Sequence, residues 1–162
     1  MNAFGTIANT GTIRFERLLP GPTERVWDYL TRPELLATWM AKGEIQLHVG
    51  GYVELRFDGS AEENGDKSAD VISGVVTHCH PPDSLSYYWT DASTISNVIF
   101  ELERRGRDVL LLLTHAKLPK PYVPTCSAGW HARLDILQEQ LHNRPSSSFP
   151  VLYESLVPHY EQ

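Results

Sequence analysis

The chain has 162 residues, of which 41% are hydrophobic and 21% charged, and this composition is typical of one globular domain. Asp and Glu number 20 against 14 Lys and Arg, so the formal net charge is -6, and the lack of a Lys/Arg cluster argues against nucleic-acid binding. No stretch approaches the ~18 apolar residues of a membrane span. Without a signal-peptide pattern, a cytoplasmic location is the default expectation. Cys79 and Cys126 are too few for a disulfide scaffold.

The chain begins with a leader and a strand. Residues 1–11 are small and polar, so we expect a flexible leader. Over residues 12–19, Ile13 and Phe15 alternate with charged side chains, which predicts a strand. Pro20-Gly21-Pro22 ends it.

Two short helices are predicted next. Apolar residues recur at helical spacing over residues 23–30 and again over about 32–40. Thr31 and Glu34 stand at the spacing of a capping box, and Pro33 suits the first turn of the second helix.

The middle of the chain is rich in strand signals. Alternating or continuous apolar runs are separated by turn residues, and a polar loop is expected over residues 58–67. The predicted strands cover residues 44–48, 52–57, 70–80, 84–89, 96–103 and 108–115.

A clear amphipathic helix follows over about residues 127–142, because Trp130, Leu134, Leu137 and Leu141 recur at offsets of four and three. The order is therefore a strand, two short helices, a run of strands and one long helix. We expect an α+β fold in which a curved antiparallel sheet of six or seven strands wraps around the C-terminal helix.

Local patterns accompany this order along most of the chain. They are Glu24-Arg25-Val26-Trp27, Pro33-Glu34-Leu35 leading to Trp39, Val49-Gly50-Gly51, Gly74-Val75-Val76, Pro81-Pro82, and Gly129-Trp130 with the leucines that follow. In this order and at this spacing, the chain resembles the helix-grip superfamily (Bet v 1-like, START/SRPBCC). Within it, the chain resembles the family named for the activator of the heat-shock protein 90 ATPase (AHSA1-like).

The resemblance implies one helix-grip domain over residues 12–142 and a tail over residues 143–162, where at most a short helix is expected near the end. The family has no shared catalytic motif to carry over, so no catalytic residue is assigned. Some members bind hydrophobic small molecules, and the founding domain contacts a chaperone. Three functions follow: small-molecule binding, a co-chaperone-like interaction module with a filled core, and a cyclase- or hydratase-type enzyme.

A ligand between the sheet and the long helix would need an apolar wall with polar handles. Large aromatic and aliphatic residues at the predicted sheet–helix interface supply one, although they could equally fill the core. The candidate ligand-binding residues are Trp39, Met40, Tyr87, Trp89, Trp130 and Leu134. Alternation places Tyr87 and Trp89 on one face of their strand and Tyr88 on the other.

Five polar residues are further candidates for such a cavity: His78, His80, His115, Glu54 and Arg56. The three histidines have the ligand chemistry of a metal site, but no carboxylate completes it, so neither a metal nor a cofactor is expected. Glu54 and Arg56 share a strand face and are more simply an exterior ion pair. The chain is expected to act as a monomer or, through an exposed edge near residues 12–19, as a homodimer.

Overall fold

The structure is a computed structural model that describes residues 3–8, 11–57, 70–91 and 94–161. The polar loop expected over residues 58–67 lies outside this part of the chain. In chain order the elements are β1 (Thr6–Ala8), β2 (Thr12–Pro20), α1 (Thr23–Thr31), α2 (Pro33–Leu36), β3 (Lys42–Ile45), β4 (Tyr52–Phe57), β5 (Asp70–His80), β6 (Ser84–Thr90), β7 (Ile95–Arg105), β8 (Asp108–Ala116), a short 3-10 helix (Lys120–Tyr122), α3 (Val123–Leu141) and α4 (Phe149–Tyr160).

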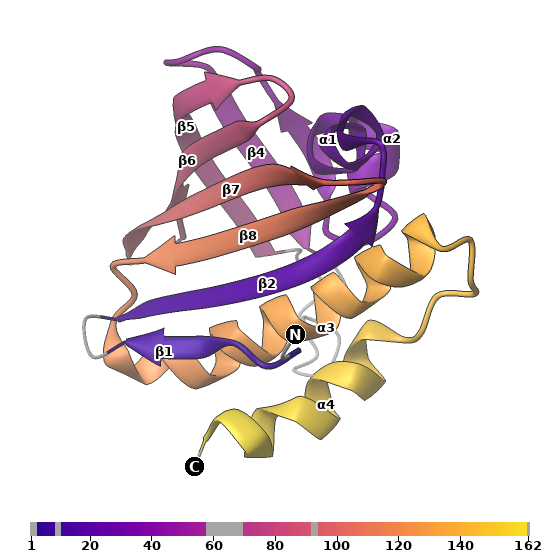
Figure 1. The fold of residues 1–162 in the computed structure, drawn as a ribbon. Helices are drawn as coiled ribbons and strands as arrows, with labels where there is room; N and C mark the ends of the chain where they lie inside the picture. Colours follow the sequence, from indigo (N-terminus) through magenta and orange to yellow (C-terminus); the bar gives the residue numbers. More distant parts are fainter. Residues whose placement is uncertain (1–2, 9–10, 58–69, 92–93, 162) are drawn as a thin grey trace.

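The strands form one antiparallel sheet of eight in the order β1-β2-β8-β7-β6-β5-β4-β3, as far as the described residues extend. Strands β3 to β8 are joined as successive hairpin neighbours, and β2 closes onto β8. The sheet curves over α3, while α1 and α2 lie near one end and α4 packs against α3 (Figure 1). The predicted α+β architecture of a curved sheet gripping a long helix is confirmed.

The additional strand is β1, which lies in the segment expected to be a flexible leader. Ile7 faces Ile13 across the β1–β2 pair, and the backbone N–H of Gly5 donates to the hydroxyl of Tyr160 over 2.9 Å. Three residues are too few to show an alternation in the sequence. The pairing instead depends on the open edge of β2 and on the distant C-terminal helix, so residues 12–14 of β2 are a covered edge.

The connection between α1 and α2 differs from the predicted capping box. Thr31 belongs to the last turn of α1, and its hydroxyl donates to the Trp27 carbonyl over 2.8 Å. Glu34 accepts from Arg32 Nε over 2.9 Å instead of reaching back to cap the helix. Because the hydroxyl finds an acceptor within its own helix, α2 begins without a side-chain cap and ends at Leu36.

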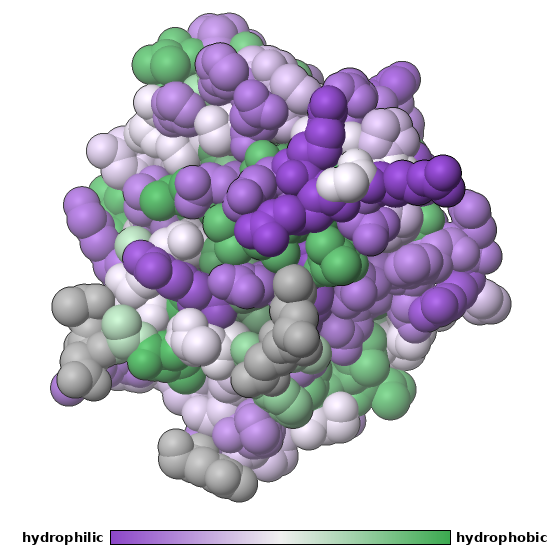
Figure 2. All heavy atoms as spheres, in the orientation of Figure 1, coloured by the Kyte–Doolittle hydropathy of each residue, from purple (hydrophilic) through white to green (hydrophobic). Residues whose placement is uncertain are grey.

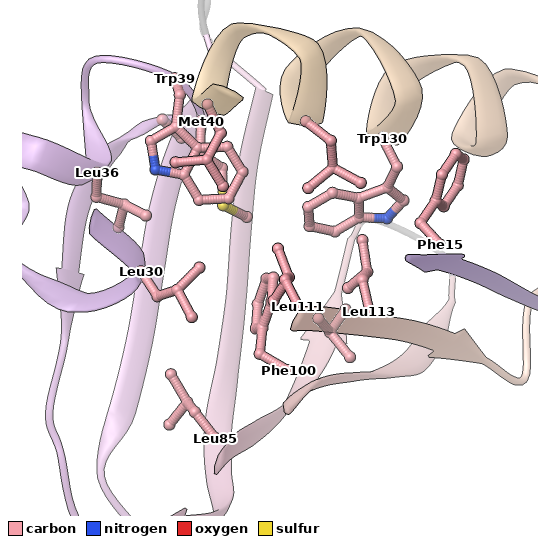
Figure 3. Packing of buried hydrophobic residues seen from close by; sticks show 14 of the residues in the cluster. Phe15, Leu30, Leu36, Trp39, Met40, Leu85, Phe100, Leu111, Leu113 and Trp130 are labelled. Atoms are coloured by element: carbon pink, nitrogen blue, oxygen red, sulfur yellow. The ribbon is translucent and has the colours of Figure 1, made fainter. Parts of the chain in front are cut away.

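The core lies between the concave face of the sheet and α3. Trp130 projects from α3 toward β8, next to Phe15 and Leu113, with Phe100 and Leu111 beneath (Figure 3). These side chains are almost completely buried. Truncating one of them to alanine would cost about 2–5 kcal/mol of unfolding free energy.

Hydrophilic side chains cover most of the face shown in Figure 2, with hydrophobic residues interspersed among them. Residues on β2 show the reason, because Arg14, Glu16 and Leu18 are exposed while Ile13, Phe15 and Leu19 are buried. Burial alternates along the whole strand, but only its first half follows the sequence pattern, because Arg17 is buried and Leu18 is exposed.

Strand β6 approaches β5 closely at a glycine of β5. A Cβ at Gly74 would lie 1.8 Å from the Tyr88 carbonyl oxygen on β6. We therefore expect Gly74→Ala to lower the free energy of unfolding by about 1–3 kcal/mol, measured by urea denaturation. Gly129→Ala in α3 is the control, because a Cβ there meets nothing within 4 Å and should be neutral or stabilising. Equal stability of the two variants would contradict the packing described.

Candidate functional site

A pocket of about 700 Å³ opens to solvent along one face of α3. It lies between α3, the connection from α2 to β3, the ends of β4 to β6, and the first turns of α4. Its apolar lining comes mainly from Trp39, Met40, Phe57, Ile72, Trp89 and Trp130. The core beneath is filled, so this pocket is where the sheet and helix leave space between them.

Aromatic rings form the deep wall of the pocket. The ring centroids of Trp89 and Trp130 are 5.5 Å apart at 55°, and those of Phe57 and Trp89 are 5.5 Å apart at 45°. These tilted arrangements are favourable for aromatic pairs. The wall therefore joins β4, β6 and α3 through direct ring contacts.

The orientation of Trp130 is fixed by a buried hydrogen-bond chain. Its indole Nε1–H donates to Nδ1 of His115 over 2.9 Å, which places the imidazole proton on Nε2. That nitrogen is 2.7 Å from Ser96 Oγ, and the serine hydroxyl is 3.3 Å from the Trp89 carbonyl oxygen. A single neutral tautomer of His115 satisfies every bond in the chain. The network ties α3 to β8, β7 and β6 immediately behind the pocket.

Cys126 lines the pocket, and its Sγ lies 3.4 Å from His115 Nδ1. Burial lowers the pKa of His115 to about 3 and raises the pKa of the Cys126 thiol to about 12. Both groups are therefore uncharged at neutral pH. A nucleophilic cysteine needs a thiolate, so this pair is built for packing and hydrogen bonding and not for nucleophilic attack.

The mouth of the pocket is shaped by Arg133 of α3. Its guanidinium carbon lies 3.9 Å from the ring centroid of Phe149 and 4.8 Å from that of Phe57. Arg133 Nη1 also donates to the Met40 carbonyl. One side chain thus links β4, the α2–β3 connection and α4. Phe149 stacks in turn on Tyr153, which also lines the pocket.

Helix α4 is held in place by a second, polar cluster. The Tyr160 hydroxyl accepts from Gly5 N–H and lies 2.9 Å from His131 Nδ1. His131 Nε2 is 3.6 Å from Asp135, which is itself 3.4 Å from the buried guanidinium of Arg17. Burial lowers the pKa of Arg17, and the neighbouring Asp135 offsets part of that effect. The C-terminal helix is therefore fixed against α3 and β2.

The structure separates the six apolar candidates into two groups. Trp39, Met40, Trp89 and Trp130 line the pocket together. Tyr87 and Leu134 are completely buried in the core and do not line it. Alternation placed Tyr87 on the inner face correctly, but it could not show how deep along the sheet that position lies.

The polar candidates are scattered. His78 and His80 are exposed, bonded to Ser84 and paired with Asp83 respectively, whereas His115 is buried, so the three histidines do not meet. Glu54 and Arg56 form an exposed ion pair of 3.1 Å.

Arg56 also lines the pocket. So do several residues that the sequence analysis did not single out: Lys42, Phe57, Cys126, Arg133, Phe149 and Tyr153. In the tail, the i, i+4 spacing of Phe149 and Tyr153 could have indicated that these two side chains lie side by side on a helix.

A curved sheet around a long helix, with a pocket open beside that helix, defines the helix-grip class of proteins. The sequence profile of the family described as "Activator of Hsp90 ATPase homolog 1-like protein" matches residues 20–142. The chain belongs to this family. Helix α4, strand β1 and all of strand β2 except Pro20 lie outside the matched residues.

Solved structures share the fold. A protein from Bordetella parapertussis, solved by NMR, is 32% identical over 99% of this chain and 90% of its own, with a TM-score of 0.82. CalU16 from Micromonospora echinospora is 22% identical over 98% of this chain and 92% of its own, with a TM-score of 0.74. The Aha1 dimer from Colwellia psychrerythraea is 18% identical over 80% of this chain and 95% of its own, with a TM-score of 0.66.

Among curated proteins, none matches this chain. Within the described residues, no helix is long and apolar enough to cross a membrane.

The buried imidazole predicts a specific loss of stability in acid. The pKa of His115 is about 3 when folded and returns to its ordinary 6.5 on unfolding, so the unfolded chain binds the proton more tightly. The contribution of His115 is complete above pH 6.5 and falls by about 1.4 kcal/mol per pH unit below it. Between pH 7 and 5, urea denaturation should show the wild type losing about 2 kcal/mol more than His115→Gln. Parallel losses in the two proteins would show that His115 is not buried as a neutral group.

Proposed function

We propose that the protein binds a small hydrophobic or amphipathic molecule in the pocket between α3, the sheet and α4. The observation that carries the proposal is a pocket of about 700 Å³ with a wall of aromatic rings that is open to solvent on one side. Ligand sites are typically clefts of about 300–1,000 Å³ with a mainly apolar lining and a few polar groups. The pocket matches this description in size and in chemistry.

Preorganisation supports the same function. Trp130 is held by a buried hydrogen bond to His115, and Trp89 packs against both rings. A ligand that stacks on these indoles would not need to order them first, which favours affinity.

Two alternatives explain the site less well. A co-chaperone-like module would dock through its outer surface, and the pocket with its aromatic wall would then have no role. A cyclase- or hydratase-type enzyme needs a general acid or base in the cavity with a pKa near 7. His115 does not line the pocket, and burial moves its pKa and that of Cys126 far from 7.

A residue that fills the pocket tests the proposal without removing any part of the core. Gly129 lines the pocket from α3, and a Cβ built there meets nothing within 4 Å. The Gly129→Leu variant should therefore occupy the ligand space while favouring the helix. We expect the neutral fluorophore 1-pyrenebutanol to bind the wild type saturably at one site and to bind Gly129→Leu at least about tenfold more weakly.

The matched control is Gly129→Ala, which adds one methyl group and should keep wild-type binding. Circular dichroism and urea denaturation establish that both variants are folded. Binding that is unaffected by Gly129→Leu in the folded protein would place the ligand elsewhere and refute the proposed site.

A further inference from the structure

The charged side chains that line the pocket are all cationic among the described residues. They are Lys42, Arg56 and Arg133, and no described Asp or Glu lines the pocket. The whole chain has a net charge of -6, so these three cations have the opposite sign to the protein as a whole. Such a local excess of one sign in a cleft attracts ligands of the opposite charge.

Two of these cations are direct neighbours across a strand pair. Lys42 of β3 stands opposite Arg56 of β4 in the antiparallel register. Like charges directly opposite each other are unfavourable in a sheet. Arg56 donates from Nε and Nη2 to Glu54, which lies two residues away on the same strand, and Glu54 is not a lining residue. Arg56 is therefore paired with a carboxylate outside the pocket lining, and Lys42 and Arg133 are the other cations of the lining.

Arg133 holds its charge next to the apolar wall. The guanidinium lies over the rings of both Phe57 and Phe149, and one N–H donates to the Met40 carbonyl. A guanidinium carries five N–H donors in a rigid fork that matches the oxygens of an oxyanion. Here that fork is oriented by ring stacking before any ligand arrives.

Resting on the proposed binding function, we infer that the ligand is an amphipathic anion. Its apolar, ring-bearing body packs on Trp89 and Trp130, and its carboxylate, sulfate or phosphate group is bound at the mouth by Arg133, with Lys42 and Arg56 beside it. The anionic group stays near water and near the cations, while the body enters the aromatic part of the pocket.

A pair of probes with one body and two end groups tests the charge separately from the pocket. 1-Pyrenebutanoate and 1-pyrenebutanol differ only in the group at the end of the chain. The wild type should bind the carboxylate about tenfold more tightly than the alcohol at pH 7.5, because charge-assisted hydrogen bonds are stronger than neutral ones. In Arg133→Met the two affinities should converge, and Arg56→Met should reduce the ratio on its own.

Arg105→Met is the control, because Arg105 pairs with Glu103 in the β7–β8 hairpin and does not line the pocket. It should keep the wild-type ratio. Equal binding of the two probes to the wild type would overturn the anion inference and leave the proposed function standing. A ratio that survives in both Arg133→Met and Arg56→Met would overturn it as well. If neither probe bound, the proposed function would itself fail.

Discussion

The hydrogen bond from the Trp130 indole to His115 is the contact on which the pocket depends. It joins the long helix to the sheet at a position where both partners are buried. The imidazole also bonds to the Ser96 hydroxyl, which in turn bonds to the Trp89 carbonyl in the backbone of β6. The two indoles that form the deep wall are therefore positioned by one chain of polar contacts. A buried network of this kind stabilises the fold only when every member is satisfied, and a neutral His115 satisfies this one.

The opposite side of the pocket is built by a segment outside the family-matched residues. Helix α4 contributes Phe149 and Tyr153 to the lining, and it is anchored by Tyr160 to His131 and Gly5. The N-terminal strand and the C-terminal helix thus hold each other in place across the whole length of the chain. The family-matched residues supply strands β3 to β8, α3 and the deep wall, whereas α4 completes the mouth.

The sequence predicted the architecture well, because periodicity records which face of each strand and helix is buried. Ile13 and Phe15 on β2, and Trp130 and Leu137 on α3, are buried as their spacing indicates. Periodicity does not show how far along a strand the pocket begins. The sequence therefore could not distinguish Tyr87, which is in the core, from Trp89, which lines the pocket. The sequence also could not predict contacts between distant segments. Strand β1 forms because β2 pairs with it and the Tyr160 hydroxyl accepts a hydrogen bond from Gly5 beside it. The stacking of Arg133 on Phe57 and Phe149 arises only when three elements meet, so no local sequence pattern records it.

Tryptophan indole resonances provide the most direct test of where a ligand binds. The chain has four tryptophans; Trp39, Trp89 and Trp130 line the pocket, whereas Trp27 of α1 is buried and does not. In a 15N-labelled sample titrated with 1-pyrenebutanoate, the indole N–H signals of the three lining residues should shift together and saturate, while the Trp27 signal stays in place. Saturable binding that leaves the Trp89 and Trp130 signals unmoved would contradict the account.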